Sequence, residues 1–349
     1  MPVYKDTQRG TWFVSIYING AKVTRRGFAT RKDAQREEAR LRMDKPTVRI
    51  KVVTLIDDYI LYKKGRVKES THHTYTDYVT NFIVPYFGEK YVSNIGYKEA
   101  EKFMDYLRDK GYSAHYCNNV FGFIRSAWKY GMRYHGVESN PFSLVERPKT
   151  GKKEEMKTWS PEEFLCFYKA LTSKKARNMF LLMYWTGMRK GEMRGLQWKD
   201  MSWSDRTVSI TKQYSRYGGL TAPKTDSAAR KIDIPPLVMD SLHEWYSVCQ
   251  GIEGFTDDWF MFGDKEPIGL NTIDWHWHKG IRDSGVPAIR IHDLRHSHAS
   301  WLFANKFDTA YISHRLGHSS IAITMQVYTH LMNDVAQRER ARLNSMTLF

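Results

Sequence analysis

The sequence reads His292-Asp293-Leu294-Arg295-His296 near its C-terminus, followed by Leu316-Gly317-His318-Ser319-Ser320 and, ten residues after His318, by Tyr328. These stretches place three imidazoles, a guanidinium and a phenol in one short span. A guanidinium binds phosphate through paired hydrogen bonds, an imidazole transfers protons near neutral pH, and a phenol oxygen can attack phosphorus. The pattern therefore predicts a site that holds a phosphate and attacks it.

The composition is that of a globular protein with an anionic partner. The chain has 349 residues, enough for about two or three domains. It carries 54 Lys and Arg against 38 Asp and Glu, a formal charge of +16. This balance indicates a polyanion such as nucleic acid, although solvated lysines alone produce the same excess.

Cysteine usage and hydropathy bear on the compartment. Cys117, Cys166 and Cys249 are far apart and match no zinc or disulfide spacing, so we expect small buried side chains in a reducing compartment. The N-terminus lacks the apolar core of a signal peptide, and no run of about eighteen apolar residues occurs. We therefore expect a soluble cytoplasmic protein without a membrane partner.

Residues 1–48 are predicted to form a small separate module, a three-stranded β-sheet plus one helix. An alternating stretch, the turn signal Asn19-Gly20 and a returning stretch predict a β-hairpin. Thr30 then caps a helix that runs to Met43, with Asp33 in place of the usual Glu of a capping box.

This first module carries much of the positive charge. Residues 1–50 contain twelve Lys and Arg against five Asp and Glu. Lys22, Arg25 and Arg26 lie on or beside the returning strand. Two interpretations stay open: a basic β-ribbon that enters a DNA groove, or a solvated edge strand that its charge protects from aggregation.

Residues 52–148 change to helical periods rich in aromatic residues, which predict an all-α domain of four or five helices. The aromatic residues have core spacing, so packing explains most of them better than base stacking. A basic run separates the first two helices, where phosphate contacts or solvated loop residues are both consistent with the sequence. It comprises Lys63, Lys64, Arg66 and Lys68.

A linker and a second, larger domain follow. The stretch from Glu146 to Glu155 is highly charged and has no apolar residue, which places an interdomain linker at residues 149–158. A mainly α domain is predicted over residues 159–349. Ser160 can cap its first helix and Glu163 can complete a capping box.

Further charged residues precede the opening motifs. Arg189 and Glu192, at i and i+3, share one face of a predicted helix. Residues 206–212 and 230–234 alternate like two antiparallel strands, and the long polar connection between them contains Lys224.

In chain order, five motifs resemble the tyrosine recombinase, or phage integrase, family: Thr186-Gly187-Met188-Arg189-x-x-Glu192, Pro223-Lys224-Thr225, His292-x-x-Arg295, Leu316-Gly317-His318 and Tyr328. Each motif alone is a weak signal, but their order and spacing make coincidence improbable. The resemblance implies the tyrosine recombinase catalytic fold, mainly α with a small antiparallel sheet.

The first two modules resemble the arm-binding and SAM-like core-binding domains of three-domain integrases from bacteriophages and integrative elements of Gram-positive bacteria. The opening Tyr4-Lys5-Asp6-x-x-x-Gly10-x-Trp12 is familiar in that group. The resemblance implies arm-type DNA binding by residues 1–48 and core-site binding by residues 52–148.

The chemistry also follows from the residue types. Displacement at a DNA phosphodiester builds charge on the nonbridging oxygens, which Arg189 and Arg295 can stabilise. A tyrosine hydroxyl needs cationic surroundings to react at neutral pH, and Tyr328 fits that need. The covalent phosphotyrosine keeps the energy of the broken bond, so rejoining requires neither ATP nor, in this scheme, a metal or other cofactor.

The family resemblance assigns the remaining roles. Lys224 is implied to protonate the leaving hydroxyl. His292 and His318 are implied to hydrogen-bond the phosphate or assist proton transfer, while Glu192 braces the site from behind.

The implied function is site-specific recombination. The enzyme would integrate or excise a phage or mobile-element genome through a 3′-phosphotyrosine and a Holliday junction, as a homotetramer on double-stranded core and arm sites. Accessory partners would be an excisionase and a host DNA-bending protein, in the bacterial cytoplasm at the nucleoid. The basic tail of residues 333–349 would dock on a neighbouring subunit or on its own domain.

Three alternatives remain. A noncatalytic DNA-binding regulator could retain this fold. A resolvase or a type IB topoisomerase would use similar chemistry, although the separate N-terminal module favours an integrase. The histidines of Trp275-His276-Trp277-His278, with His292, His296 and His298, could be imagined as a metal cluster, but no carboxylate-rich pattern accompanies them.

Overall fold

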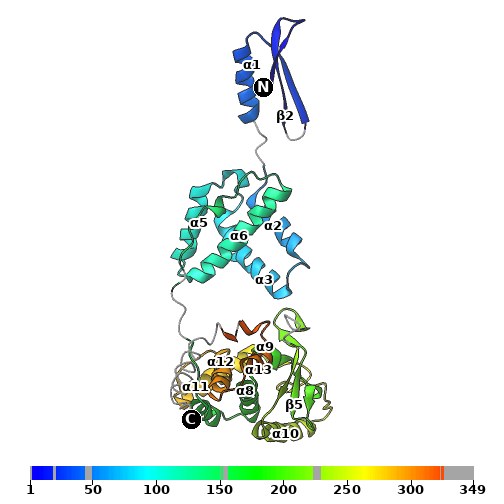
Figure 1. Cartoon of the computed structure of the whole chain (residues 1–349), viewed down its shortest axis with the longest axis vertical. Coiled ribbons are helices and arrows are strands. Elements are labelled where there is room, and N and C mark those ends of the chain that lie inside the picture. The colour runs from blue at the N-terminus through cyan, green and yellow to red at the C-terminus, as the bar shows by residue number, and fades with distance from the viewer. Residues whose placement is uncertain are drawn as a thin grey trace, which may run out of the picture. The chain divides into compact units, whose positions relative to one another are not determined.

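The computed structural model describes residues 2–18, 21–43, 49–149, 151, 156–222, 229–322 and 324–325 (Figure 1). The chain divides into two compact units, Met1–Lys152 and Lys153–Phe349. Several predictions concern residues outside the described ones. These are the Asn19-Gly20 turn, half of the linker, Lys224, Tyr328 and the C-terminal tail.

The N-terminal module is an antiparallel sheet covered by one helix, as predicted. Its elements are β1 (Val3–Asp6), β2 (Thr11–Ile18), β3 (Ala21–Phe28) and α1 (Arg31–Met43), with β2 central. In Figure 1, α1 runs along one side of this sheet. Val14 and Ile16 pack with Leu41 between sheet and helix. The Thr30 hydroxyl accepts a hydrogen bond from the Asp33 amide at 3.1 Å, which confirms the predicted cap.

The second module is helical, and its core confirms the packing role of the aromatic residues. Trp128 and Phe103 are fully buried, and α6 packs against the other long helices. The elements are α2 (Val52–Lys63), α3 (Glu69–Tyr78), a π turn (Val79–Ile83), α4 (Val84–Phe87), a 3₁₀ turn (Val92–Asn94), α5 (Tyr97–Asp109), α6 (Ala114–Tyr134) and a 3₁₀ turn (Pro141–Ser143).

The second unit is mainly helical, and α8 lies in its core against α10 and α12. Ser160 and Glu163 form the predicted capping box. The helices are α7 (Pro161–Ala170), α8 (Lys174–Thr186), α9 (Lys190–Gly195), a 3₁₀ turn (Trp198–Asp200), α10 (Pro236–Gln250), α11 (Leu270–Ser284), α12 (Asp293–Ala304) and α13 (Thr309–Leu316).

A small antiparallel sheet contains the two strands that the sequence predicted. Its order is β4 (Met201–Ser202), β5 (Thr207–Ile210) and β8 (Arg230–Asp233). The prediction missed a second hairpin inside the polar connection, β6 (Gln213–Ser215) with β7 (Gly219–Thr221). Three-residue strands without a buried face carry no hydropathy signal.

The cysteine prediction holds for two of the three residues. Cys117 and Cys249 are buried, whereas Cys166 is exposed. On α7 the buried side chains are Phe164 and Phe167, spaced one helical turn apart, and Cys166 lies off that stripe. In the described part of the chain, no helix is both long and apolar enough to cross a membrane.

Candidate active site

The site begins where α8 ends. Gly187 adopts a left-handed conformation, with φ of 65°, and terminates the helix. A Cβ atom at this position would lie 2.8 Å from Leu316 Cδ2 and 2.9 Å from His298 Cδ2. Glycine therefore serves two needs here, because it permits the turn and lets the end of α8 approach α12 and α13 closely.

The turn places Arg189 against the carboxylate of Glu192. The Arg189 amide donates to Glu192 Oε2 at 2.9 Å, and its Nη1 donates to Oε1 at 2.8 Å. Nη2 donates to the Gly317 carbonyl at 3.3 Å. The Glu192 side chain is only 3 % exposed, against 36 % for Arg189. The carboxylate thus fixes a guanidinium that still reaches solvent, and the predicted i, i+3 pairing is confirmed.

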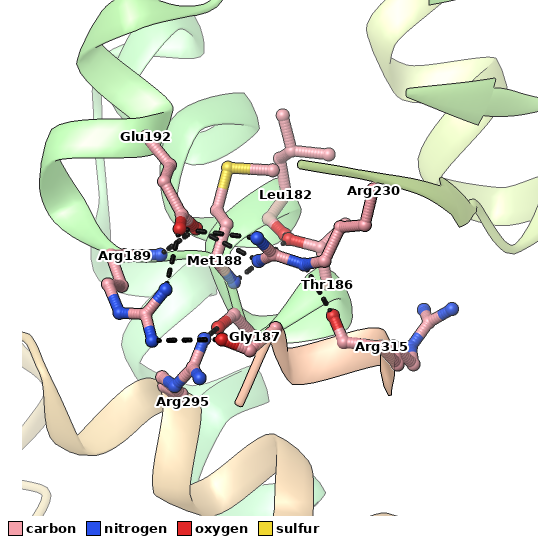
Figure 2. A network of polar contacts seen from close by, with 10 residues as sticks. Leu182, Thr186, Gly187, Met188, Arg189, Glu192, Arg230, Arg295 and Arg315 are labelled. Atoms are coloured by element: carbon pink, nitrogen blue, oxygen red, sulfur yellow. Dashed lines mark hydrogen bonds and ion pairs between the residues drawn. The ribbon is translucent and has the colours of Figure 1, made fainter. Parts of the chain in front are cut away.

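Arg230, which is in none of the sequence motifs, holds Glu192 from the opposite side (Figure 2). Its Nη2 donates to Glu192 Oε2 at 2.9 Å and its Nη1 to Oε1 at 3.2 Å, and the side chain has no exposed surface. One signal was available in the sequence. Arg230 alternates in phase with the buried Ile232 and Ile234, an unusual place for a charge.

Burial opposes ionisation of the Glu192 carboxyl, but the hydrogen bonds and charge of Arg230, together with Arg189, outweigh it and hold its pKa below the usual value. The carboxylate therefore stays charged at neutral pH. It serves as the common acceptor for two guanidiniums from different elements.

Arg295 enters the site from α12. It is buried, and its Nη1 donates to the Gly187 carbonyl at 2.9 Å. The carbonyl that ends α8 therefore orients this guanidinium, just as the Gly317 carbonyl, at the end of α13, orients Arg189. Figure 2 shows Arg189, Arg230 and Arg295 grouped around the Gly187 turn.

The imidazoles of His292 and His318 share this environment. Burial, and then the charges of Arg295 and Arg189, lower the pKa of His318 to about 4. The pKa of His292 is also lowered, first because protein atoms displace water from its ring and then by Arg295. Both rings are therefore neutral near pH 7. His318 Nδ1 lies 2.6 Å from the hydroxyl of Thr324, a buried residue outside the sequence motifs.

Among the described residues, five predicted site residues thus come together. Two guanidiniums act electrostatically on two neutral imidazoles, with a buried carboxylate behind them. The five residues are Arg189, Glu192, His292, Arg295 and His318. The positions of Lys224 and Tyr328 lie outside the described residues.

The histidines of α11 do not form a metal centre with described residues, where no group of three or more His, Cys, Asp or Glu side chains could hold an ion. Trp277, between His276 and His278, is buried and donates from Nε1 to the Ile289 carbonyl at 3.1 Å. Trp277 therefore belongs to the helix packing, whereas Trp275 is exposed.

The predicted DNA-contact residues of the N-terminal module lie on β3, and the strand register separates them. Arg26 pairs with Phe13 and Lys22 with Tyr17, whereas Arg25 pairs with Val14, which is buried under α1. Side chains alternate between the faces of a sheet. Lys22 and Arg26 therefore share the face away from α1, where the Arg26 guanidinium lies 5.0 Å from the Phe13 ring centre. Arg25 projects to the other face.

The basic run of the helical module lies at the end of α2 and the start of α3. Arg66 lies 4.0 Å from the ring centre of Tyr62, and Lys63 lies 5.3 Å from that of Tyr59. Lys64, Arg66 and Lys68 are exposed, while Lys63 is half-buried. The aromatic rings hold two of the four charges near the surface, where an anion can reach them.

Three protein-family models match this chain and identify the family that its candidate site comes from. The model of the phage integrase family matches residues 160–334, half of the chain. The chain belongs to the phage integrase family. The models of its N-terminal SAM-like domain and of an arm DNA-binding domain match residues 51–108 and 2–43. The resemblance drawn from the five motifs is thereby confirmed, and so is the tyrosine recombinase fold with its arm-binding, SAM-like and catalytic domains.

Related sequences include an integrase and a transposon protein. The ICEBs1 integrase of Bacillus subtilis (strain 168) is 28 % identical over 333 residues, which cover 90 % of each chain. The transposase from transposon Tn916 of Enterococcus faecalis is 25 % identical over 286 residues, 74 % of this chain and 68 % of the relative. Site-specific recombination that integrates or excises a mobile element is therefore the activity of this family member.

Solved structures share the fold. The Tn1549 transposon integrase in complex with a circular intermediate DNA has a TM-score of 0.71 at 19 % identity, covering 84 % of this chain and 99 % of that chain. A lambda integrase tetramer bound to a Holliday junction has a TM-score of 0.60 at 17 % identity, covering 91 % and 96 %.

Proposed function

We propose that this chain cleaves and rejoins DNA through a 3′-phosphotyrosine on Tyr328 and a Holliday junction, without metal or ATP, to integrate or excise a phage or mobile-element genome. The observation that carries the proposal is the pairing of two guanidiniums with two neutral imidazoles. Arg189 and Arg295 are each fixed by the carbonyl of a left-handed glycine, so their orientation is set before any phosphate arrives.

Preorientation matters because the pentacoordinate transition state carries more negative charge than the ground state on its nonbridging oxygens. Guanidiniums that are already fixed stabilise that charge without having to reorganise. Arg189 and Arg295 supply this stabilisation. The Tyr328 oxygen attacks phosphorus, the bond to the 5′ oxygen breaks, and Lys224 gives that oxygen its proton.

The two histidines act as neutral hydrogen-bonding groups. A depressed pKa keeps His318 and His292 uncharged at neutral pH, so each ring has one donor and one acceptor nitrogen. Because the Thr324 hydroxyl engages His318 Nδ1, the remaining Nε2 can either donate to a phosphate oxygen or accept the proton of the attacking phenol. Glu192 stays behind Arg189 and contacts no DNA.

We assign DNA binding to the other modules. We assign arm-site binding to residues 1–48, core-site binding to residues 52–148, the linker to 149–158 and catalysis to 159–349. The open sheet face with Lys22 and Arg26 and the exposed α2–α3 connection support these roles. Four copies act on two DNA sites in the bacterial cytoplasm, with an excisionase and a host DNA-bending protein as partners.

The decisive experiment detects the covalent intermediate. A nicked duplex, selected from a random-sequence pool by its binding to the full-length protein, is incubated with wild type and with Tyr328→Phe. We expect a denaturant-resistant protein–DNA adduct from wild type alone. No adduct from wild type, or equal amounts from both, would reject the recombinase and favour the noncatalytic regulator.

Two further tests address the finer claims. EDTA should leave adduct formation unchanged. Loss of the adduct in EDTA would support the metal hypothesis instead. Deletion of residues 1–48 should abolish integration at arm-containing sites and spare cleavage at the core site. Unchanged integration would reject the arm-binding role.

A further inference from the structure

Arg230 connects three segments of the site that are far apart in the sequence. Its Nη atoms hold both oxygens of Glu192 on α9, and its Nε donates to the Arg315 carbonyl near the end of α13 at 2.7 Å. Arg230 itself opens β8. Figure 2 shows the guanidinium between the Glu192 carboxylate and the Arg315 backbone.

The packing leaves Arg230 little freedom to move. Gly317 follows α13 in a left-handed conformation, with φ of 66°, and a Cβ atom there would lie 2.9 Å from Arg230 Nη1. The carbonyl of the same glycine accepts the hydrogen bond from Arg189. A shift of Arg230 therefore displaces both the carboxylate that holds Arg189 and the segment that ends in His318.

The charges impose a second constraint. The Glu192 carboxylate faces Arg189 from its own helix and Arg230 from β8, and Arg295 from α12 and His318 lie beyond them around the same turn. The Arg315 side chain of α13 donates instead to His298 and to the Trp185 carbonyl. The buried Arg230 thus neutralises the Glu192 carboxylate. The positive charge of the partly exposed Arg189 therefore stays available to an anion that approaches from solvent.

We propose that Arg230 is a positioning residue for strand cleavage: it clamps Glu192 and the end of α13 together, so that Arg189 and His318 face the scissile phosphate in a fixed geometry. The proposal rests on the phosphotyrosine mechanism given above. Arg230 is fully buried, so it acts through Arg189 and His318 and does not touch DNA itself.

The test compares wild type with variants of Arg230. The rate measured is that of single-turnover cleavage of the selected nicked duplex at saturating DNA. Arg230→Gln should slow adduct formation roughly 100-fold while DNA affinity stays unchanged, since displacing a catalytic group by about 1 Å has an effect of that size. Arg230→Lys, which keeps the charge and one hydrogen bond, should recover part of the rate.

The pH profile separates positioning from mere folding. Without Arg230 the Glu192 carboxyl keeps Arg189 as its one cationic partner among the described residues, so its pKa rises and it takes up a proton at higher pH. The acidic limb of the rate profile should therefore move to higher pH in Arg230→Gln and return toward wild type in Arg230→Lys.

Arg194→Gln is the matched control. Arg194 is a buried arginine of the same helix as Glu192, but it donates to the Ile268 carbonyl and packs on the Tyr214 ring. Its replacement should lower the melting temperature without moving the acidic limb. An equal shift of that limb in both variants would reject the clamp.

The outcomes distinguish the two proposals. No adduct from wild type rejects the recombinase mechanism and the clamp with it. A wild-type adduct with an unchanged rate and pH limb in Arg230→Gln rejects the clamp alone. If the Arg230→Gln variant does not fold, the double variant Glu192→Gln/Arg230→Gln replaces it, because this double variant removes both buried charges. We expect the double variant to fold, to cleave slowly and to lack the acidic limb of the rate profile. A double variant that cleaves like wild type, or that also unfolds, rejects the positioning role.

Discussion

His318 Nδ1 lies 2.6 Å from the Thr324 hydroxyl, which is completely buried. This hydrogen bond fixes the orientation of an imidazole that the sequence could only place in a motif. It also fixes which ring nitrogen is left for the phosphate, because the nitrogen bound to Thr324 is not available. Tyr328 follows Thr324 by four residues in the sequence.

Thr324→Val should remove this hydrogen bond and keep the shape of the side chain. We expect a loss of about 1–3 kcal/mol in the free energy of unfolding, because a buried ring nitrogen loses its partner. Cleavage should slow as well, since the ring can then rotate. Urea unfolding and adduct formation measure the two effects, with Thr324→Ser as the control that retains the hydroxyl. Equal behaviour of Val and Ser variants would show that the hydrogen bond is unimportant.

The free energy of unfolding should decrease as the pH is lowered, because His318 resists protonation in the folded state. Its pKa is lowered from 6.5 to about 4, so the unfolded chain binds the proton more readily between these values. The stabilisation is therefore present above pH 6.5 and is lost as the pH falls toward 4. From this residue alone we expect a loss of about 2 kcal/mol between pH 7 and pH 5. His318→Gln should show a correspondingly weaker pH dependence in urea unfolding, and an unchanged dependence would contradict the assignment.

Gly317→Ala should destabilise the chain more than Gly285→Ala does. Both glycines end a helix in the left-handed conformation, with φ of 66° and 71°. A Cβ at Gly285 meets nothing within 4 Å, whereas one at Gly317 meets the pinned Arg230 guanidinium at 2.9 Å. Gly285→Ala should therefore cost about 1 kcal/mol for backbone strain, and Gly317→Ala roughly 2 kcal/mol more for the clash. Thermal unfolding gives both values, and equal losses would mean that Arg230 yields.

The register of the N-terminal sheet makes Arg25 a control for Arg26. Arg26 lies on the open face with Phe13 and Lys22, and Arg25 lies on the opposite one. Arg26→Ala should weaken binding to an arm-site duplex and reduce the slope of log affinity against log salt by about 1. Arg25→Ala should change neither quantity as much. The measurement is a fluorescence-anisotropy titration of the full-length chain at several salt concentrations, and a larger effect of Arg25 would place the DNA on the other face.

Local features of the chain were predictable from the sequence because their causes are local. A hydroxyl at Thr30 or Ser160 caps the helix that follows it, and three residues of spacing bring Arg189 onto Glu192. Such interactions depend on backbone geometry over a single turn. The order of the five motifs likewise sufficed to recognise the family.

Contacts between distant segments were not predictable in the same way. Arg230 meets Glu192 across 38 residues of sequence, and Arg189 meets the Gly317 carbonyl across 128. The alternation of residues along the strand indicated that Arg230 would be buried, but the sequence did not indicate which residue would pair with it. The exposure of Cys166 depended in turn on which face of α7 the core covers.

The sequence by itself thus determined the family and the local elements, because caps, turns and periodicity act within a few residues. The tertiary structure decided which charges share a partner and which ring nitrogen faces outward. The physical reason is burial: a buried charge or polar atom must find its partner in whatever element packs against it, and only the assembled fold supplies Arg230 to Glu192 and Thr324 to His318.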